Sequence, residues 1–156
     1  MSELVIRRAR ASDTEAIAQI FFDAVHEGTK EVYDEAQRRA WGGEAPDPER
    51  WAARLEGLDT VVAERDGKVV GFLSLAKGGL VDLAFVAPDA IGAGVAWRLY
   101  GEIERIAREQ GVSELVTDAS FKARPFFARQ GFEVVREQRV TIRGAELTNF
   151  RMRKRL

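Results

Sequence analysis

The stretch LVDLAFVAPDAIGAGVAWRL (Leu80–Leu99) contains a strand, a turn and the start of a helix, and it decides the fold. The apolar run Leu80–Val86 predicts a buried strand, and Gly92-Ala93-Gly94 leads directly into an amphipathic helix. Small residues before a helix leave its first backbone N–H groups unpaired and unshielded, at the positive end of the helix dipole. The stretch therefore predicts a site that binds a phosphorylated ligand through the backbone, without a lysine.

This loop differs from two common phosphate-binding motifs. A dinucleotide fingerprint would need a third glycine at position 97, where Trp97 stands, and no P-loop lysine follows the glycines. A Gly-x-Gly before a helix is more often a tight turn than a phosphate site. The prediction of a phosphate site therefore depends on the elements around the loop.

Composition excludes several classes of function. The chain has 156 residues, which favours one domain over residues 1–156, and 46% of them are hydrophobic. Its formal net charge is −1, so nothing global draws it to nucleic acid or to anionic membranes. The absence of cysteine excludes thiol catalysis and disulfides, and a single histidine, His26, is too little for a conventional metal site.

Cellular location is expected to be cytoplasmic. The start of the chain, MSELVIRRAR, lacks the apolar run of a signal peptide, and no stretch is apolar enough to cross a membrane. We therefore expect no membrane partner.

The rest of the chain alternates between helical and β-type patterns. Ser12 and Glu15 suggest a capping box for a helix over about 13–26, and Asp47-Pro48 suggests the start of a short helix. A second helix is expected over 29–41. The other expected elements are the strands Glu3–Arg8, Thr60–Arg65, Lys68–Leu75 and Glu114–Thr117, a helix from the glycine loop to Gly111, a short helix before Gly131, and a final hairpin of Phe132–Ile142 and Ala145–Met152.

This order predicts an α/β (α+β) fold with a mixed, mostly antiparallel central sheet of about seven strands and helices on both faces. The final hairpin offers an edge for pairing with a second copy, so the sequence leaves a homodimer open.

In element order and in two motifs, the chain resembles the GNAT superfamily of acyl-CoA-dependent N-acyltransferases. The family's loop motif, Gln/Arg-x-x-Gly-x-Gly/Ala, corresponds to Ile91–Ala96, where Gly94 and Ala96 match and Ile91 replaces the polar first residue. Its later Asn-x-x-Ala-x-x-x-Tyr-x-x-x-Gly-Phe pattern corresponds to Ser120, Ala123, Phe127, Gly131 and Phe132.

The resemblance implies that acetyl-CoA is the co-substrate. Pantetheine would lie between the splayed strands Leu80–Val86 and Glu114–Thr117, pairing with the backbone of Phe85 and Val86, and the Val86 N–H would stabilise charge on the thioester oxygen. The residues expected to bind the cofactor are Phe85, Val86, Ile91, Gly92, Ala93, Gly94, Val95, Ala96, Ser120 and Phe127.

Direct transfer to an amine needs a base and a proton donor for the leaving thiolate. Asp82 is the expected base, because it is the one charge in an apolar strand and stands where histone-acetylating members have a glutamate. Phe127 occupies the position of the family's tyrosine acid and cannot donate a proton. Ser120 could hydrogen-bond the sulfur or relay a water, with a helix cap as the alternative. Tyr33 is the other candidate hydroxyl, with a substrate or proton-relay role or, as the alternative, packing.

These residues predict an acetyl-CoA-dependent N-acetyltransferase acting on a small-molecule or peptide amine. One alternative is a CoA-binding module of the same fold that has lost its chemistry, because Ile91 and Phe127 depart from the motifs. Another is a binder of some other nucleotide or sugar phosphate, which ADP alone would protect against thermal unfolding as well as CoA does. The sequence does not identify the acceptor.

Overall fold

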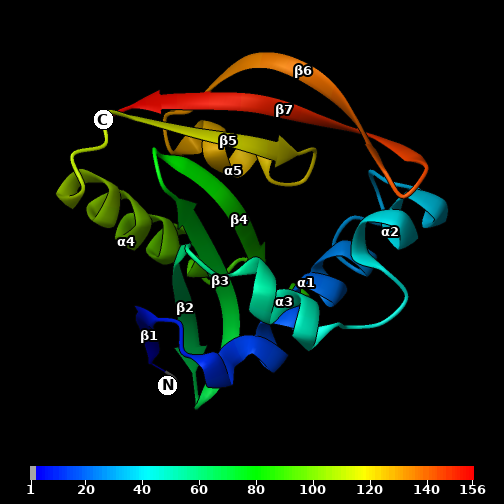
Figure 1. Cartoon of the computed structure of the whole chain (residues 1–156), viewed down its shortest axis with the longest axis horizontal. Coiled ribbons are helices and arrows are strands. Elements are labelled where there is room, and N and C mark those ends of the chain that lie inside the picture. The colour runs from blue at the N-terminus through cyan, green and yellow to red at the C-terminus, as the bar shows by residue number, and fades with distance from the viewer. Residues whose placement is uncertain (1–2) are drawn as a thin grey trace.

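The alternation of strands and helices is present in the computed structural model, which describes residues 3–156 (Figure 1). In chain order the elements are β1 (Leu4–Arg8), α1 (Thr14–His26), α2 (Glu35–Gly42), α3 (Pro48–Arg54), β2 (Asp59–Arg65), β3 (Lys68–Ala76), β4 (Leu80–Val86), α4 (Val95–Glu109), β5 (Glu114–Ser120), α5 (Arg124–Arg129), β6 (Glu133–Ile142) and β7 (Ala145–Arg155). Single 3-10 turns at Ala11–Asp13 and Pro88–Ala90 precede α1 and follow β4. The single domain over residues 1–156 stays a prediction, and its first two residues lie outside the described part.

The strands form one seven-stranded sheet in the order β1-β2-β3-β4-β5-β7-β6. Every neighbouring pair is antiparallel except β4 and β5, which run parallel. The expected mixed, mostly antiparallel sheet with helices on both faces is confirmed. The edge strand β6 comes from the final hairpin, and pairing of two copies through it stays a prediction.

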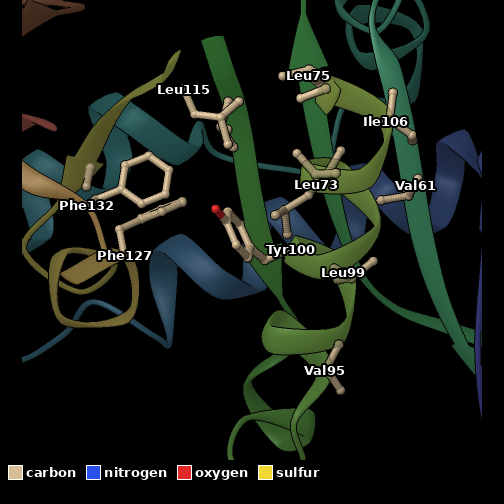
Figure 2. Close-up of a cluster of buried hydrophobic side chains, with 14 of the residues drawn as sticks. Val61, Leu73, Leu75, Val95, Leu99, Tyr100, Ile106, Leu115, Phe127 and Phe132 are labelled. Carbon is tan, nitrogen blue, oxygen red and sulfur yellow. The ribbon is translucent and has the colours of Figure 1, made fainter. Parts of the chain in front are cut away.

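Two hydrophobic cores lie on opposite faces of β2–β4. On one face α4 buries Val95, Leu99, Ile103 and Ile106 against β2 and β3, and Figure 2 shows Leu99 and Ile106 of α4 beside Leu73 and Val61. On the other face Ile17 of α1 and Trp51 of α3 pack in a second cluster with Phe72 of β3 and Leu83 of β4. The helices thus hold the central strands between two layers (Figure 1).

Helix boundaries differ from the sequence prediction at two places. The capping box of Ser12 and Glu15 is wrong: the Asp13 carboxylate instead accepts the Arg10 backbone N–H at 2.7 Å. The second helix begins at Glu35 rather than at residue 29, because Asp34 caps it and accepts the Gln37 N–H at 2.8 Å. The predicted Asp47-Pro48 start of α3 is confirmed, with Asp47 accepting the Arg50 N–H.

The last strands are longer than predicted. β5 continues to Ser120 and β7 to Arg155, because each residue of β5 pairs with β7 along its whole length. Among residues 3–156, none of the helices has the length and apolar character that crossing a bilayer requires. The cytoplasmic location stays a prediction.

A buried ion pair anchors the start of α1. The Asp13 carboxylate accepts two hydrogen bonds from the Arg7 guanidinium, at 2.8 and 2.9 Å, and Asp13 is only 5% exposed. The hydrogen bonds from Arg7 lower the pKa of Asp13 below its usual value. A carboxyl whose pKa is lowered in the folded state stabilises the protein above its unfolded pKa, and this stabilisation disappears as the pH falls through the folded value.

We expect Asp13→Asn to lower the free energy of unfolding by about 1–3 kcal/mol at pH 7, because charged hydrogen bonds to Arg7 are lost in a buried site. The difference from the wild type should begin to shrink below about pH 4, where the carboxyl of the unfolded chain takes up a proton, and should disappear as the pH falls through the lower pKa of the folded state. Urea unfolding at pH 7 and pH 3 measures both values, with Glu31→Gln on an exposed residue as the control. A difference that is the same at both pH values would contradict the assignment.

Candidate functional site

The sheet divides between β4 and β5. These strands pair only at Leu80–Val116 and Val81–Thr117, and the Thr117 hydroxyl donates to the Val81 carbonyl at 2.9 Å at the point of divergence. Beyond that point β4 continues to pair with β3, and β5 with β7. The facing edges of β4 and β5 are therefore left without strand partners along a wedge that opens towards the glycine loop.

Asp82 stands at a β-bulge at the closed end of this wedge. In the pairing with β3, Leu75 faces Val81 and Ser74 faces Leu83, so Asp82 is the extra residue. The bulge reverses the side-chain alternation, since Val81 packs on the α4 side and Leu83 on the α1 side. Asp82 is thereby directed towards α3, where its carboxylate forms an ion pair with the Arg54 guanidinium, with a nitrogen–oxygen distance of 2.6 Å.

The glycine loop presents bare backbone to the open end of the wedge. Gly92 and Gly94 have φ of +90° and +76°, and a Cβ on either would meet nothing within 4 Å. The first intrahelical bond of α4 runs from the Arg98 N–H to the Gly94 carbonyl at 3.1 Å, so the N–H groups before it have no acceptor within the helix. The first turn carries no acidic side chain. Free space, glycine conformation and the helix dipole together suit a phosphate group.

The backbone of Val86 faces the wedge, whereas that of Phe85 does not. The Ala87 N–H donates to Val70 of β3 at 2.8 Å, and the Phe85 carbonyl lies 3.3 Å from the position of a Cβ on Gly71 of β3. Because successive amides of a strand point to opposite sides, the Val86 N–H is directed away from β3. The expectation that both residues offer their backbone to a ligand is therefore wrong for Phe85, which contributes its side chain.

A pocket of about 780 Å³ extends from the glycine loop into the wedge. Nine of the ten residues expected to bind the cofactor line it; Ala93 belongs to the loop but not to the wall. Exposed apolar side chains surround the pocket, among them Ile91 (54% exposed) and Trp97 (66% exposed). Lys122 and Arg129, which no sequence motif singles out, add positive charge to the wall.

Ser120 and Phe127 line this pocket from the β5–α5 side. The Ser120 hydroxyl accepts the Ala123 N–H at 3.1 Å, which matches the cap alternative while leaving its own hydrogen to donate. Phe127 is 1% exposed and packs edge-to-face on Phe132, with ring centroids 5.1 Å apart (Figure 2). Phe127 is thus part of the core as well as of the pocket wall.

A second pocket of about 410 Å³ adjoins the first on the α1 and α3 side of the sheet. The two share Phe85, Ser120 and Phe127, so a ligand in the wedge can meet a ligand in the second pocket. Asp82 and Arg54 lie in the wall of the second pocket, and their side chains are 21% and 41% exposed. No sequence motif marks Arg54 as the partner of Asp82, because their ion pair depends on how α3 packs against β4.

Tyr33 closes the second pocket from the segment before α2. Its hydroxyl donates to the Thr148 carbonyl at 2.8 Å and accepts the Phe121 N–H at 3.3 Å. Burial raises the pKa of Tyr33 above its ordinary value. A hydroxyl that is buried and bonded in this way favours the packing alternative, and its role in proton transfer stays untested.

Within residues 3–156, no cluster of three or more His, Cys, Asp or Glu side chains is arranged to hold a metal ion.

Comparison with known proteins gives relatives over the whole chain. Residues 29–156 match the family described as the acetyltransferase (GNAT) domain. The uncharacterized N-acetyltransferase YafP of Escherichia coli (strain K12) is 36% identical over 153 residues, which are 98% of this chain and 97% of that protein. The crystal structure of a GCN5-related N-acetyltransferase from Rhodopseudomonas palustris has a TM-score of 0.94 at 35% identity, covering 100% of this chain and 98% of the other.

A more distant structure shares the fold. The PaiA N-acetyltransferase from Thermoplasma acidophilum, solved in complex with coenzyme A, has a TM-score of 0.79 at 18% identity and covers 99% of both chains.

Proposed function

The chain belongs to the GNAT acetyltransferase family, and we propose that it transfers an acetyl group from acetyl-CoA directly to a primary amine. The observation that carries this proposal is the wedge between β4 and β5, which opens onto an uncapped helix N-terminus and leads into a second pocket. An anion site, an unpaired strand edge and an adjoining acceptor pocket form one continuous path.

The residues present fit acetyl-CoA, which supplies an acyl group activated as a thioester. Gly92, Gly94 and the first N–H groups of α4 would hold the diphosphate, where there is open space and no competing carboxylate. The Val86 N–H would donate a hydrogen bond at the thioester oxygen, where negative charge develops. This assignment depends on backbone direction and not on the identity of the Val86 side chain.

Asp82 takes the role of the base in this proposal. Its carboxylate lies in the acceptor pocket beside the closed end of the wedge, where it would accept a proton from the incoming ammonium group. Arg54 holds the carboxylate in place at 2.6 Å. Ser120 would donate its hydroxyl hydrogen to the sulfur, and a leaving thiol with a pKa of ~8.5 makes a stronger acid at Phe127 unnecessary.

Acetyl transfer is tested with purified protein, acetyl-CoA and a panel of primary amines, with release of free CoA as the readout. We expect release that depends on both the protein and an amine. Folded protein that binds acetyl-CoA and releases no CoA with any amine would count against catalysis.

A second function is favoured by specific contacts: a CoA-binding module without turnover. Phe127 has no proton to donate, and Asp82 is already engaged by Arg54. Both functions require CoA binding, so calorimetry alone does not separate them. The module predicts that an Asp82→Asn variant and the wild type behave alike in every assay, whereas the enzyme predicts that only turnover differs.

The exposed indole of Trp97 suggests how the adenine of CoA is held. Trp97 lies in the first turn of α4 and lines the same pocket as the glycine loop. We expect CoA to quench tryptophan fluorescence more than pantetheine does, because pantetheine lacks adenine and meets only Trp41 in the pocket wall. Trp97→Ala should remove this difference and weaken CoA binding by about tenfold, the loss of one stacked base.

Trp51→Phe in the other pocket is the matched control, because Trp51 lies away from the glycine loop. Equal quenching by CoA and pantetheine, or full quenching in Trp97→Ala, would contradict the placement of adenine.

A further inference from the structure

The second pocket is covered by a bridge between two segments that are distant in sequence. Figure 1 shows the tip of the β6–β7 hairpin lying against α2. Three hydrogen bonds join the hairpin to the region of α2: Tyr33 Oη donates to the Thr148 carbonyl at 2.8 Å, Gln37 Nε2 to the Glu146 carbonyl at 2.9 Å, and Arg143 Nη1 to the Ala40 carbonyl at 3.5 Å. We call this connection the roof; its Tyr33 and Thr148 belong to the pocket wall.

One part of the wall beneath the roof is a group of packed aromatic side chains, and the rest of the wall includes polar and charged residues such as Arg50, Asp118 and Asn149. Phe21 contacts Trp51 and Phe85 with ring centroids 4.8 and 5.0 Å apart, and Trp41 contacts Tyr33 at 5.7 Å. The volume of about 410 Å³ lies in the range of sites for small molecules, roughly 300–1,000 Å³. An apolar body of modest size would fill this space and place its amine at the polar end, next to Asp82.

A polypeptide does not fit the same surface. An extended chain needs either an open groove along its length or a free strand edge with which to pair. The roof bonds join the hairpin to α2 beside the pocket, and β7 already pairs with β5 on one side and with β6 on the other, so β7 offers no free edge to a peptide. On the α3 side the pocket wall includes the exposed Arg50 and Arg54, so this part of the wall reaches the protein surface.

We propose that the acceptor is a small amine with an apolar body, and that the roof excludes lysine side chains within polypeptides. This inference rests on the proposed function, because it presumes that the thioester lies in the wedge. It decides between the two acceptor classes that the sequence leaves open.

The test uses two conjugates in which the CoA sulfur is joined through an acetyl linker to an amine. In one the amine is phenethylamine, and in the other it is the lysine side chain of an octapeptide. Isothermal titration calorimetry with the full chain gives the dissociation constants of both conjugates and of CoA. We expect the peptide conjugate to bind at least about tenfold more weakly than the phenethyl conjugate.

A double variant, Gln37→Ala with Arg143→Ala, removes two of the three roof bonds without altering a residue of the pocket wall. The difference between the dissociation constants of the two conjugates should be smaller in this variant than in the wild type. Thermal unfolding checks that the variant is folded. Equal affinities in the wild type would overturn the inference, as would failure of the phenethyl conjugate to bind while CoA binds. Failure of CoA itself to bind would instead contradict the proposed function.

Discussion

Asp82→Asn is expected to lower kcat by about 100-fold or more, because removing a positioned general base typically costs 10²–10⁴-fold. The amide has nearly the same size and still fits the β-bulge, but it cannot accept the proton of the ammonium group. Affinity for CoA should be unchanged, since Asp82 lies in the acceptor pocket and outside the wall of the cofactor pocket. Steady-state kinetics and calorimetry on one preparation measure both quantities.

The Arg54 pair provides the matched control for this variant. Arg54→Gln removes the 2.6 Å contact and leaves the carboxylate in place. If Asp82 is the base, Arg54→Gln should retain a larger share of the activity than Asp82→Asn, because only Asp82→Asn removes the proton acceptor. Equal loss in both variants, or full activity of Asp82→Asn, would show that Asp82 holds α3 against β4 and does not move a proton.

Gly94→Val is expected to weaken CoA binding by about 100-fold, close to 2.7 kcal/mol. Gly94 has φ of +76°, a conformation that costs an L-residue roughly 1–2 kcal/mol and a β-branched one more. The loop would shift to relieve this strain, and the new methyl groups would cover N–H groups that face the diphosphate. Calorimetry with CoA gives the affinity, and thermal unfolding gives the cost in stability.

Gly67→Val separates backbone strain from loss of the anion site. Gly67 also has φ of +76° with open space around it, but it lies in the turn between β2 and β3. We expect both variants to lose similar stability and only Gly94→Val to lose CoA affinity. Equal CoA affinities in the two variants would contradict a role for the loop in binding the diphosphate.

The segment from β4 to α4 is predictable because its signals are local. The apolar run of β4 and the glycines before α4 each restrict the backbone within a few residues, and the helix keeps its apolar face at regular spacing. The observed bounds, Leu80–Val86 and Val95–Glu109, agree with this interpretation. Seven of the nine predicted cofactor residues that line one pocket come from this segment, and the other two, Ser120 and Phe127, come from the β5–α5 region.

Capping was harder to predict because several side chains compete for each helix start. Ser12 with Glu15 has the spacing of a capping box. The helix start is instead fixed at Asp13, whose carboxylate accepts a hydrogen bond from Arg7 of β1, a tertiary contact. The box of Asp34 with Gln37 was present in the sequence and would have given the true start of α2. Local patterns decide such positions only where no tertiary ion pair overrides them.

The acceptor pocket could not be derived from sequence. Its walls combine Phe21, Trp51, Asp82 and Thr148 from four elements, and their meeting depends on the packing of α3 and on the register of β6 with β7. The bulge at Asp82 is also hidden, because a continuous apolar strand gives no alternation from which a reversal could be detected. Asp82 could be chosen as a candidate base, but its partner Arg54 could not.

The central claim is that CoA binds with its diphosphate at the start of α4 and its pantetheine between β4 and β5. A crystal structure of the complex with coenzyme A tests it most directly. We expect diphosphate oxygens within hydrogen-bond distance of the backbone N–H groups between Gly92 and Ala96, and the sulfur near the Val86 N–H. Coenzyme A bound elsewhere on the molecule, with the wedge closed or filled by side chains, would contradict the claim.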